Sequence, residues 1–467
     1  MKKQLNRRKF IQKTSLSGLL MAAGGLFTSA SSSRAERASG GQYMGGFAAA
    51  PLETVRIALI GVGARGSGHA RQLATIAGTE IVAISDLYED LAKKSAVACQ
   101  EIGAGQRHEE IALYHGGEDR WKAMLAEVKP DVVFISTNWK NHAPMAIEAM
   151  RQGAHAFVEV PMAVTLEELW EIVDTSEQTQ RHCMMMENVN YGRDELMYLN
   201  MCRKGLVGEL LHAEAAYIHE LRWQMEEVER GTGSWRTFHY AKRNGNLYPT
   251  HGLGPVAQYM NLGRTDDTFQ TLVSFSSPAR GRAAYASANY AADHQWNKLD
   301  YQGGDINTSI IKTALGRTIM VQWDETSPRP YSRHNLIQGT KGTLAGFPTR
   351  IALDGGVEGA TENHHHWAQG EQLDKLREEY EHPLYRRLGA KAKEMGGHGG
   401  MDFMMLYRIV ECLQQGTPLD QNLYEGCFWS AVSPLSEKSV AEGGAPQEFP
   451  DFTRGGWRTT AALEILE

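Results

Sequence analysis

Cysteine is scarce in this sequence, and no two cysteines have the CxxC spacing. Five occur among the 467 residues, scattered along the chain as Cys99, Cys183, Cys202, Cys412 and Cys427. An odd, scattered set does not fit the even, closely spaced pattern of a disulfide framework. The absence of a disulfide framework favours a chain that folds in a reducing compartment.

Clusters of positive charge are also missing after the first 35 residues, and the formal net charge is -7. Proteins that bind nucleic acid usually present clustered Lys and Arg, so we expect no nucleic-acid partner. Beyond the leader described next, no apolar run is long enough to span a bilayer, and we expect no stable membrane insertion once that leader is removed. The length and an apolar content of 42% instead indicate a large core shared by two domains.

Residues 1–35 have the basic start, apolar stretch and small-residue end of a secretory signal, with candidate cleavage points near Ala30 and Ala35. The adjacent Arg7 and Arg8 resemble a twin-arginine signal, whose pathway carries folded proteins. The alternatives are an ordinary basic start and a retained anchor, for which the apolar stretch is short. We expect export by the twin-arginine route to the periplasm or the cell exterior, in agreement with the cysteine pattern.

After residue 35 the pattern of predicted secondary structure changes along the chain. Residues 36–52 are a small-residue linker that we expect to be loosely ordered. Residues 53–185 alternate apolar strands with helices, which predicts a nucleotide-binding α/β domain with a doubly wound parallel sheet. Residues 186–467 predict an α+β domain with a mostly antiparallel open sheet and a late helix over 401–415. The parallel strands are predicted in TVRIALIGVG, TEIVAISD, DVVFIST, AHAFVEV and HCMMMEN.

A glycine motif, GVGARG, follows the first strand and opens a helix. Its glycines have the GxGxxG spacing in the strand and helix context that the motif requires. Glycines there let the backbone approach a pyrophosphate at the amino end of the helix. Asp86 ends the second strand, where a carboxylate accepts from the ribose 2'-hydroxyl and repels a 2'-phosphate. We predict NAD as the cofactor, bound in part by Gly61, Gly63, Ala64, Arg65, Gly66 and Asp86.

Ligands of an open parallel sheet lie beyond the carboxyl ends of its strands. This rule adds to the expected NAD site the residues Asn138, Trp139, His142, Glu159, Val160 and Asn188. Singly, these have plainer interpretations: Trp139 as a packing residue, His142 as a helix cap and Asn188 as a turn former. Their convergence on one crevice is the basis of the prediction.

The stretch STNWKNHAPMAIEAMRQGAHAFVEVP resembles the glucose-fructose oxidoreductase and inositol dehydrogenase superfamily. In that superfamily the second strand ends in EKP, and simple dehydrogenases use its lysine at the reacting hydroxyl. Here the tripeptide is Glu159, Val160 and Pro161, without the lysine. A simple sugar or cyclitol dehydrogenase therefore stays the alternative function.

A subgroup of the superfamily is matched over residues 53–460. GVGARG, WxxH, EVP, ENVNY, SWR, GNLYPTHGLGP, RPYSR and GHGGMDF resemble the NAD-dependent glycoside hydrolases typified by bacterial α-N-acetylgalactosaminidases. The resemblance implies hydrolysis through oxidation at sugar C3, loss of a C2 proton and the C1 substituent, addition of water and re-reduction. Because net redox change is zero, tightly bound NAD is recycled in place. Such a protein could work where no nicotinamide pool exists.

This chemistry needs a base for the C3 hydroxyl and a base for C2. In NGNLYPTHGLGP we predict His251 for the hydroxyl proton, with Tyr248 assisting or binding. Tyr191 in ENVNY is the candidate for the C2 proton, and by resemblance Glu159 contacts the nicotinamide. The open alternatives are a buried loop histidine and an aromatic residue at the domain junction.

Tyrosines and an arginine suit a sugar, because its ring and hydroxyl rim need flat surfaces and donors. By resemblance, the residues that bind the glycan or glycoside are Tyr217, Arg236, Tyr248, Pro249, Thr250, His251 and Tyr331. The superfamily commonly pairs through the open face of the second sheet, so we expect a homodimer.

Two further motifs have open interpretations. The run His364 to His366 suggests a metal, but three consecutive side chains do not converge easily on one ion, so we predict a solvated loop and no metal site. GHGGMDF, with His398 and Asp402, is either the flexible start of a helix or a segment that closes over the site.

A non-catalytic, NAD-containing sugar-binding protein is disfavoured because many polar residues converge on the crevice.

Overall fold

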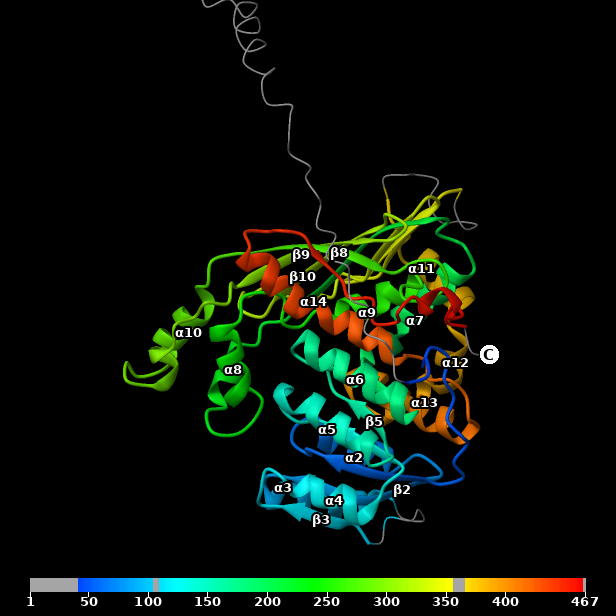
Figure 1. Ribbon diagram of the computed structural model, residues 1–467. Coiled ribbons are helices and arrows are strands. Elements are labelled where there is room, and N and C mark those ends of the chain that lie inside the picture. The colour runs from blue at the N-terminus through cyan, green and yellow to red at the C-terminus, as the bar shows by residue number, and fades with distance from the viewer. Residues whose placement is uncertain (1–40, 104–107, 109, 356–365, 465–467) are drawn as a thin grey trace, which may run out of the picture. The chain divides into compact units, whose positions relative to one another are not determined.

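The computed structural model describes residues 41–103, 108, 110–355 and 366–464 (Figure 1). The leader predicted over residues 1–35 lies outside them. Within the described ranges, no helix combines the length and the apolar character that crossing a membrane would need.

Six parallel strands form the first sheet, in the order β3-β2-β1-β4-β5-β6. The central strands are buried almost throughout, as their apolar runs require in a sheet covered on both faces. The predicted doubly wound parallel sheet is therefore confirmed. Its elements are β1 (Val55–Ile60), α2 (Gly66–Leu73), β2 (Thr79–Asp86), α3 (Glu89–Ile102), β3 (Ala112–His115), α4 (Arg120–Val128), β4 (Val132–Ile135), α5 (Trp139–Arg151), β5 (His155–Val158), α6 (Leu166–Thr179) and β6 (Cys183–Met185).

The second sheet has eight strands in the order β13-β12-β11-β7-β10-β9-β8-β14. Every neighbouring pair is antiparallel except β7 and β10, which confirms the mostly antiparallel prediction. Its elements and their connections are η1 (Asn188–Tyr191), α7 (Arg193–Arg203), β7 (Leu210–Ile218), η2 (Arg222–Glu226), α8 (Gly233–Lys242), α9 (Thr250–Tyr259), β8 (Phe269–Ser276), α10 (Gly281–Asn289), η3 (Gln295–Lys298), β9 (Ile306–Thr313), β10 (Thr318–Asp324), β11 (Leu336–Gly339), β12 (Gly342–Ala345), β13 (Arg350–Leu353) and β14 (Gln447–Glu448).

Helix α13 returns from the second half of the chain to the first sheet. It spans the predicted range and stops at Gly416, whose φ of 66° is the left-handed conformation that glycine favours after a helix. Its apolar side chains share one core with β1, β2 and α2. The two predicted domains on either side of residue 185 therefore share a hydrophobic core. The other late elements are α11 (Glu371–Tyr380), α12 (Pro383–Met395), η4 (His398–Gly400), α13 (Met401–Gln415), α14 (Leu423–Ala441) and η5 (Gly456–Thr459).

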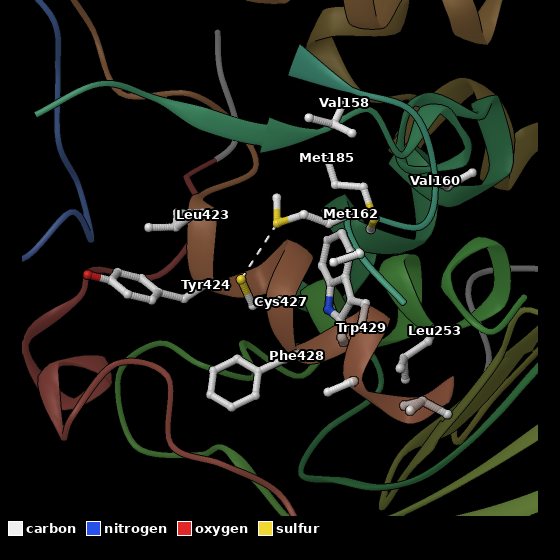
Figure 2. Packing of buried hydrophobic residues seen from close by; sticks show 14 of the residues in the cluster. Val158, Val160, Met162, Met185, Leu253, Leu423, Tyr424, Cys427, Phe428 and Trp429 are labelled. Carbon is white, nitrogen blue, oxygen red and sulfur yellow. Dashed lines mark hydrogen bonds between the residues drawn. The ribbon is translucent and has the colours of Figure 1, made fainter. Parts of the chain in front are cut away.

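Helix α14 is buried between the second sheet and α6 (Figure 1). Figure 2 shows its side chains packed against Met162 and Met185, and the Cys427 thiol lies 3.6 Å from the Met162 sulfur. The Ser430 hydroxyl accepts from the Met162 backbone N–H at 3.0 Å. These contacts fix the loop that follows β5, which carries Glu159.

The described part of the linker, residues 41–52, is packed against other elements. The Tyr43 ring stacks on Tyr424 with centroids 4.9 Å apart, and the Met44 N–H donates to the Tyr424 hydroxyl at 3.0 Å. Met44 is buried. Our expectation of loose order was wrong for these residues, because the few large side chains among the small ones anchor the segment.

Candidate active site

The glycine turn after β1 has the shape that a pyrophosphate needs. Gly61 has a φ of 81°, and a Cβ at Gly66 would lie 1.9 Å from the Gly61 carbonyl oxygen, so helix and strand pack too closely for any side chain there. A Cβ at Gly63 would meet nothing within 4 Å. The start of α2 has no side-chain cap. Open space at Gly63 and uncapped N–H groups fit a phosphate at this helix end.

Asp86 lies at the end of β2 beside this turn. One carboxylate oxygen accepts from the Val62 N–H at 2.8 Å and the other from the Tyr88 N–H at 2.9 Å. Each oxygen keeps a further lone pair, which is available to ribose hydroxyls. Arg230, from the segment between η2 and α8, stands 4.2 Å from the Tyr88 ring centroid and donates to Asp90 at 2.8 Å.

The residues at the other strand ends include buried polar atoms that the described part of the chain leaves without partners. These are Asn138 Oδ1, Trp139 Nε1 and Asn188 Oδ1. Buried polar groups are normally hydrogen-bonded, so unsatisfied atoms at the edge where a dinucleotide binds fit a bound ligand. Together with Asp86 and the glycine turn, they fit NAD.

Both ring nitrogens of His142 lie close to backbone carbonyl oxygens. Its Nδ1 lies 2.7 Å from the Pro161 carbonyl and its Nε2 lies 3.1 Å from the Thr137 carbonyl. Burial lowers the pKa of this imidazole. Because both nitrogens face backbone oxygens, His142 holds the loop after β5 against the loop after β4, and so places Glu159 and Asn138 indirectly.

A buried charge network surrounds Glu159. Arg65 bridges Glu159 at 3.0 Å and Asp402 at 2.9 Å, and His69 contacts Glu159 at 2.6 Å. Burial alone would raise the pKa of the Glu159 carboxyl, but Arg65 and the His69 hydrogen bond hold it below its usual range. Arg65 thus supplies its backbone to the turn and its side chain to these carboxylates.

The segment GHGGMDF contributes to this network through Asp402, near the start of α13. Asp402 accepts from the Asn188 amide at 2.6 Å and contacts His398 Nδ1 at 2.8 Å. Burial opposes ionisation of Asp402, but His398 and Arg65 hold its pKa below the usual range. Of the two interpretations of this motif, the structure favours the segment that closes over the site.

A second group, the aromatic cluster of Tyr217, Tyr248, His251 and Tyr331, lies beside this network. Tyr217 from β7 stands 4.7 Å from Tyr248 and 5.2 Å from His251, centroid to centroid. Tyr331 lies 6.2 Å from Tyr217. The cluster gathers tyrosine faces and a histidine, as a sugar site requires.

Arg236 on α8 joins the aromatic cluster to the NAD residues. Its guanidinium carbon lies 5.1 Å from the ring centroids of both Trp139 and Tyr248. Its Nε is buried without a hydrogen-bond partner in the described residues, as is the Thr250 hydroxyl. Pro249 precedes Thr250 as the residue before the first turn of α9. The predicted substrate residues therefore converge.

Sequence reasoning missed Glu187, the partner of His251. Glu187 Oε1 lies 2.6 Å from His251 Nδ1, and its side chain has no exposed surface. Its Oε2 has no hydrogen-bond partner among the described residues. The available signal was its position directly before Asn188, at the end of β6.

Tyr191 is not brought to this group. Its hydroxyl donates to Asp420 at 3.2 Å, and Arg408 donates to the same carboxylate at 2.8 Å. Burial and the Asp420 charge raise the pKa of Tyr191, which makes it a poor base. Its ring belongs to the core around α13, not to the one that holds the aromatic cluster. The Tyr191 hydroxyl is thus hydrogen-bonded to Asp420, and the C2 role stays a prediction.

The histidine run offers no described metal site. His366 is exposed, while His364 and His365 lie outside the described residues, so the solvated loop stays a prediction. Elsewhere in the described ranges, no group of three or more His, Cys, Asp or Glu side chains could hold a metal ion.

Comparisons with known proteins agree with this architecture. A family model described as glycosyl hydrolase 109, C-terminal domain, matches residues 191–459, and one for the oxidoreductase family, NAD-binding Rossmann fold, matches residues 55–187. Among solved structures, a levoglucosan dehydrogenase in complex with NADH and levoglucosan has a TM-score of 0.62 at 17% identity and covers 85% of this chain and 100% of its own. An oxidoreductase domain protein from Kribbella flavida has a TM-score of 0.63 at 14% identity, covering 85% of this chain and 100% of its own. These two likenesses show the fold.

Curated relatives are much more similar in sequence. Glycosyl hydrolase family 109 protein 1 of Akkermansia muciniphila is 63% identical over 432 residues, which cover 92% of this chain and 88% of the relative. The glycosyl hydrolase family 109 protein of Shewanella pealeana is 52% identical over 463 residues, 99% of each chain. The chain therefore belongs to glycosyl hydrolase family 109 and carries an NAD-binding Rossmann domain.

Proposed function

We propose that this glycosidase hydrolyses terminal α-N-acetylgalactosaminides with an NAD that stays bound and is recycled in the site. The observation that carries the proposal is the meeting of the NAD residues with the aromatic cluster through Trp139, Tyr248 and Arg236. A sugar held by the cluster would lie beside the cofactor.

When bound, NAD would accept the hydrogen of sugar C3 as hydride and later return it, so that the net reaction adds one water across the glycosidic bond. In this proposal His251 takes the proton from the C3 hydroxyl. Tyr217 and Tyr248 hold protons near it. Burial raises the pKa of both tyrosines, and for Tyr248 the nearby Glu159 and Glu187 charges contribute further. Both therefore act as donors rather than bases at neutral pH.

The pKa shifts of Glu159 and Asp402 favour this route over ordinary glycoside hydrolysis. Ordinary glycosidases need a carboxylic acid whose raised pKa keeps it protonated beside the scissile bond. Arg65 instead holds both Glu159 and Asp402 ionised, with the help of His69 at Glu159 and of His398 at Asp402. Neither can be that acid.

Chromogenic N-acetylgalactosaminides of both anomers test the proposal. We expect release from the α anomer without lasting absorbance of NADH, and exchange of a C2 deuterium with solvent during turnover. Retention of the full C2 label would overturn the redox route. Stoichiometric NADH would indicate a dehydrogenase, and absence of both signals a binding protein.

Tight retention of NAD is tested separately by mass spectrometry of freshly purified, denatured protein. We expect NAD to be released without any having been added. A protein that is free of NAD and does not respond to added NAD would overturn the cofactor proposal.

We also propose twin-arginine export to the periplasm or the cell exterior, supported by the leader in residues 1–35. Changing Arg7 and Arg8 together to Lys should retain a fused reporter in the cytoplasm. Unchanged export would contradict this route.

A homodimer through the open face of the second sheet is supported by exposed apolar side chains. Phe275 is 62% and Ile310 40% exposed, and Ile310 lies between Val273 and Met320 on neighbouring strands. Light scattering should give the mass of a dimer, and Phe275→Glu should reduce it to that of a monomer. A wild-type monomer would overturn this proposal.

A further inference from the structure

The buried pair of Glu187 and His251 joins a fully buried carboxylate to the base proposed for the C3 hydroxyl. We infer that Glu187 is a positioning residue, which fixes His251 in the tautomer with the proton on Nδ1 and the lone pair on Nε2. The inference rests on the proposed role of His251 as the base for the C3 hydroxyl.

The backbone holds Glu187 firmly at the end of β6. The Met186 N–H donates to the Val158 carbonyl at 2.7 Å, and the Gln421 side chain donates to the Glu187 carbonyl at 3.0 Å. Gly254 lies one turn after His251 on α9, and a Cβ there would lie 3.1 Å from Glu187 Cγ. The glycine lets the helix approach closely enough for the 2.6 Å contact.

The contact favours one tautomer of the neutral imidazole. A carboxylate oxygen that accepts at Nδ1 calls for the proton on that nitrogen, which leaves the lone pair on Nε2. Nε2 has no hydrogen-bond partner within the described residues, and the side chain is 14% exposed. The ring stands edge-on to Tyr217 at 72° and to Tyr248 at 81°. Its free nitrogen is therefore left for a ligand in the aromatic cluster.

Burial of Glu187 argues for a functional reason to keep a charge there. A fully buried carboxylate is costly unless it is paired, and one of its oxygens has no described partner. The competing explanation is that Glu187 caps η1, since Oε1 also accepts from the Val189 N–H at 3.5 Å. Both contacts use Oε1, so the loss of a cap alone would leave the tautomer of His251 unchanged.

Glu187→Gln separates the two explanations. The amide N–H₂ can donate to Nδ1 and leave the proton on Nε2, which blocks the base, as loss of the triad aspartate's charge does in serine proteases. We expect kcat to fall by roughly 10² to 10⁴-fold, with KM changed by less than about threefold and NAD content unchanged. The effect of deuterium at C3 on the rate should increase. Glu187→Asp should recover part of the loss, and Glu177→Gln, a buried carboxylate next to Tyr424, is the matched control.

The imidazole ¹⁵N spectrum gives a readout that does not depend on turnover. The His251 signals are assigned by their absence in His251→Ala. The wild type should show a protonated Nδ1, and Glu187→Gln a protonated Nε2. Equal kcat in a folded Glu187→Gln variant, or a wild type with the proton on Nε2, would overturn the inference. If Glu187→Gln does not fold, the wild-type spectrum still decides. Retention of the C2 label by the wild type would defeat the proposed function but would leave the tautomer result standing.

Discussion

Two buried histidines should make this protein lose stability in mild acid, before its carboxylates are protonated. His155 begins β5 and His182 directly precedes β6, with ring centroids 5.0 Å apart. The backbone N–H of His182 donates to Nδ1 of the His155 ring at 2.9 Å. Burial, with Arg181 adding to it, lowers the pKa of His155 to about 4. Burial, His155 and Arg181 together lower the pKa of His182 to about 3.

The pKa values give the sign and size of the effect. In the unfolded chain both imidazoles titrate near pH 6.5, so below that pH the unfolded state binds protons that the folded state does not. The free energy of unfolding therefore falls as the pH falls from about 6.5 towards about 4. Each histidine removes roughly 2 kcal/mol between pH 7 and pH 5, and the pair about 4 kcal/mol. That is a large part of the stability of a typical domain.

The assay is urea unfolding at pH 7 and pH 5, on the wild type and on His155→Asn. Asparagine keeps an acceptor for the His182 N–H but cannot take up a proton. The variant should lose about 2 kcal/mol less than the wild type on going to pH 5. An equal loss in both proteins would refute the assignment of the acid sensitivity to this pair.

Three further changes test the site. Gly66→Ala would place a Cβ 1.9 Å from the Gly61 oxygen and should destabilise the protein by about 1–3 kcal/mol; it should also purify without NAD, measured by absorbance after denaturation. Asp402→Asn should cost about 1–3 kcal/mol in thermal unfolding, less than a fully buried pair because the Arg65 side chain is 34% exposed; an unchanged midpoint would contradict the network. Arg230→Ala should speed NAD dissociation, and high salt should speed it in the wild type more than in the variant, because the lost ion pair is exposed.

The first sheet could be predicted because its signals are local. TEIVAISD is β2 from its first residue to its last, and the glycine turn follows a continuous apolar run. Strand β3 was missed because it is short and lies at the edge of the sheet, with Tyr114 as its one buried residue. A four-residue strand with one buried residue is too short to show an alternation of apolar and polar residues.

The two long late helices show what periodicity can and cannot reveal. Helix α13 keeps one partly exposed stripe at Tyr407, Glu411 and Gln414 and ends at a glycine, and its bounds agree with the prediction. Helix α14 is buried on nearly all sides, so its apolar residues do not recur with a helical period. It lies in the middle of the molecule and supports the Glu159 loop, yet no amphipathic pattern marks it.

The ion pairs of the site were beyond a reading of local patterns. Arg65 and Asp402 are 337 residues apart, and His251 and Glu187 are 64 apart. Only the fold brings such partners together. The strand-end rule came close, since it selected Asn188 and passed over Glu187, the residue directly before it. Tyr191 is a case in which the rule selected a residue whose partner it could not foresee. Its position past the same strand did not indicate that its hydroxyl would donate to Asp420.

Contacts from beyond residue 185 reach the predicted NAD site at two separate places. Arg230 contacts Tyr88 and Asp90, next to Asp86, which we predict to bind the ribose, and Asp402 pairs with Arg65 in the glycine turn. A dehydrogenase must exchange its cofactor in every cycle, so such contacts would slow it. A reaction that restores NAD in place gains from them, because retention then costs no turnover. The same retention is what a protein would need to carry its cofactor through an export pathway for folded chains. The missing lysine, the bridging contacts and the predicted twin-arginine leader all fit the proposal that the cofactor does not leave.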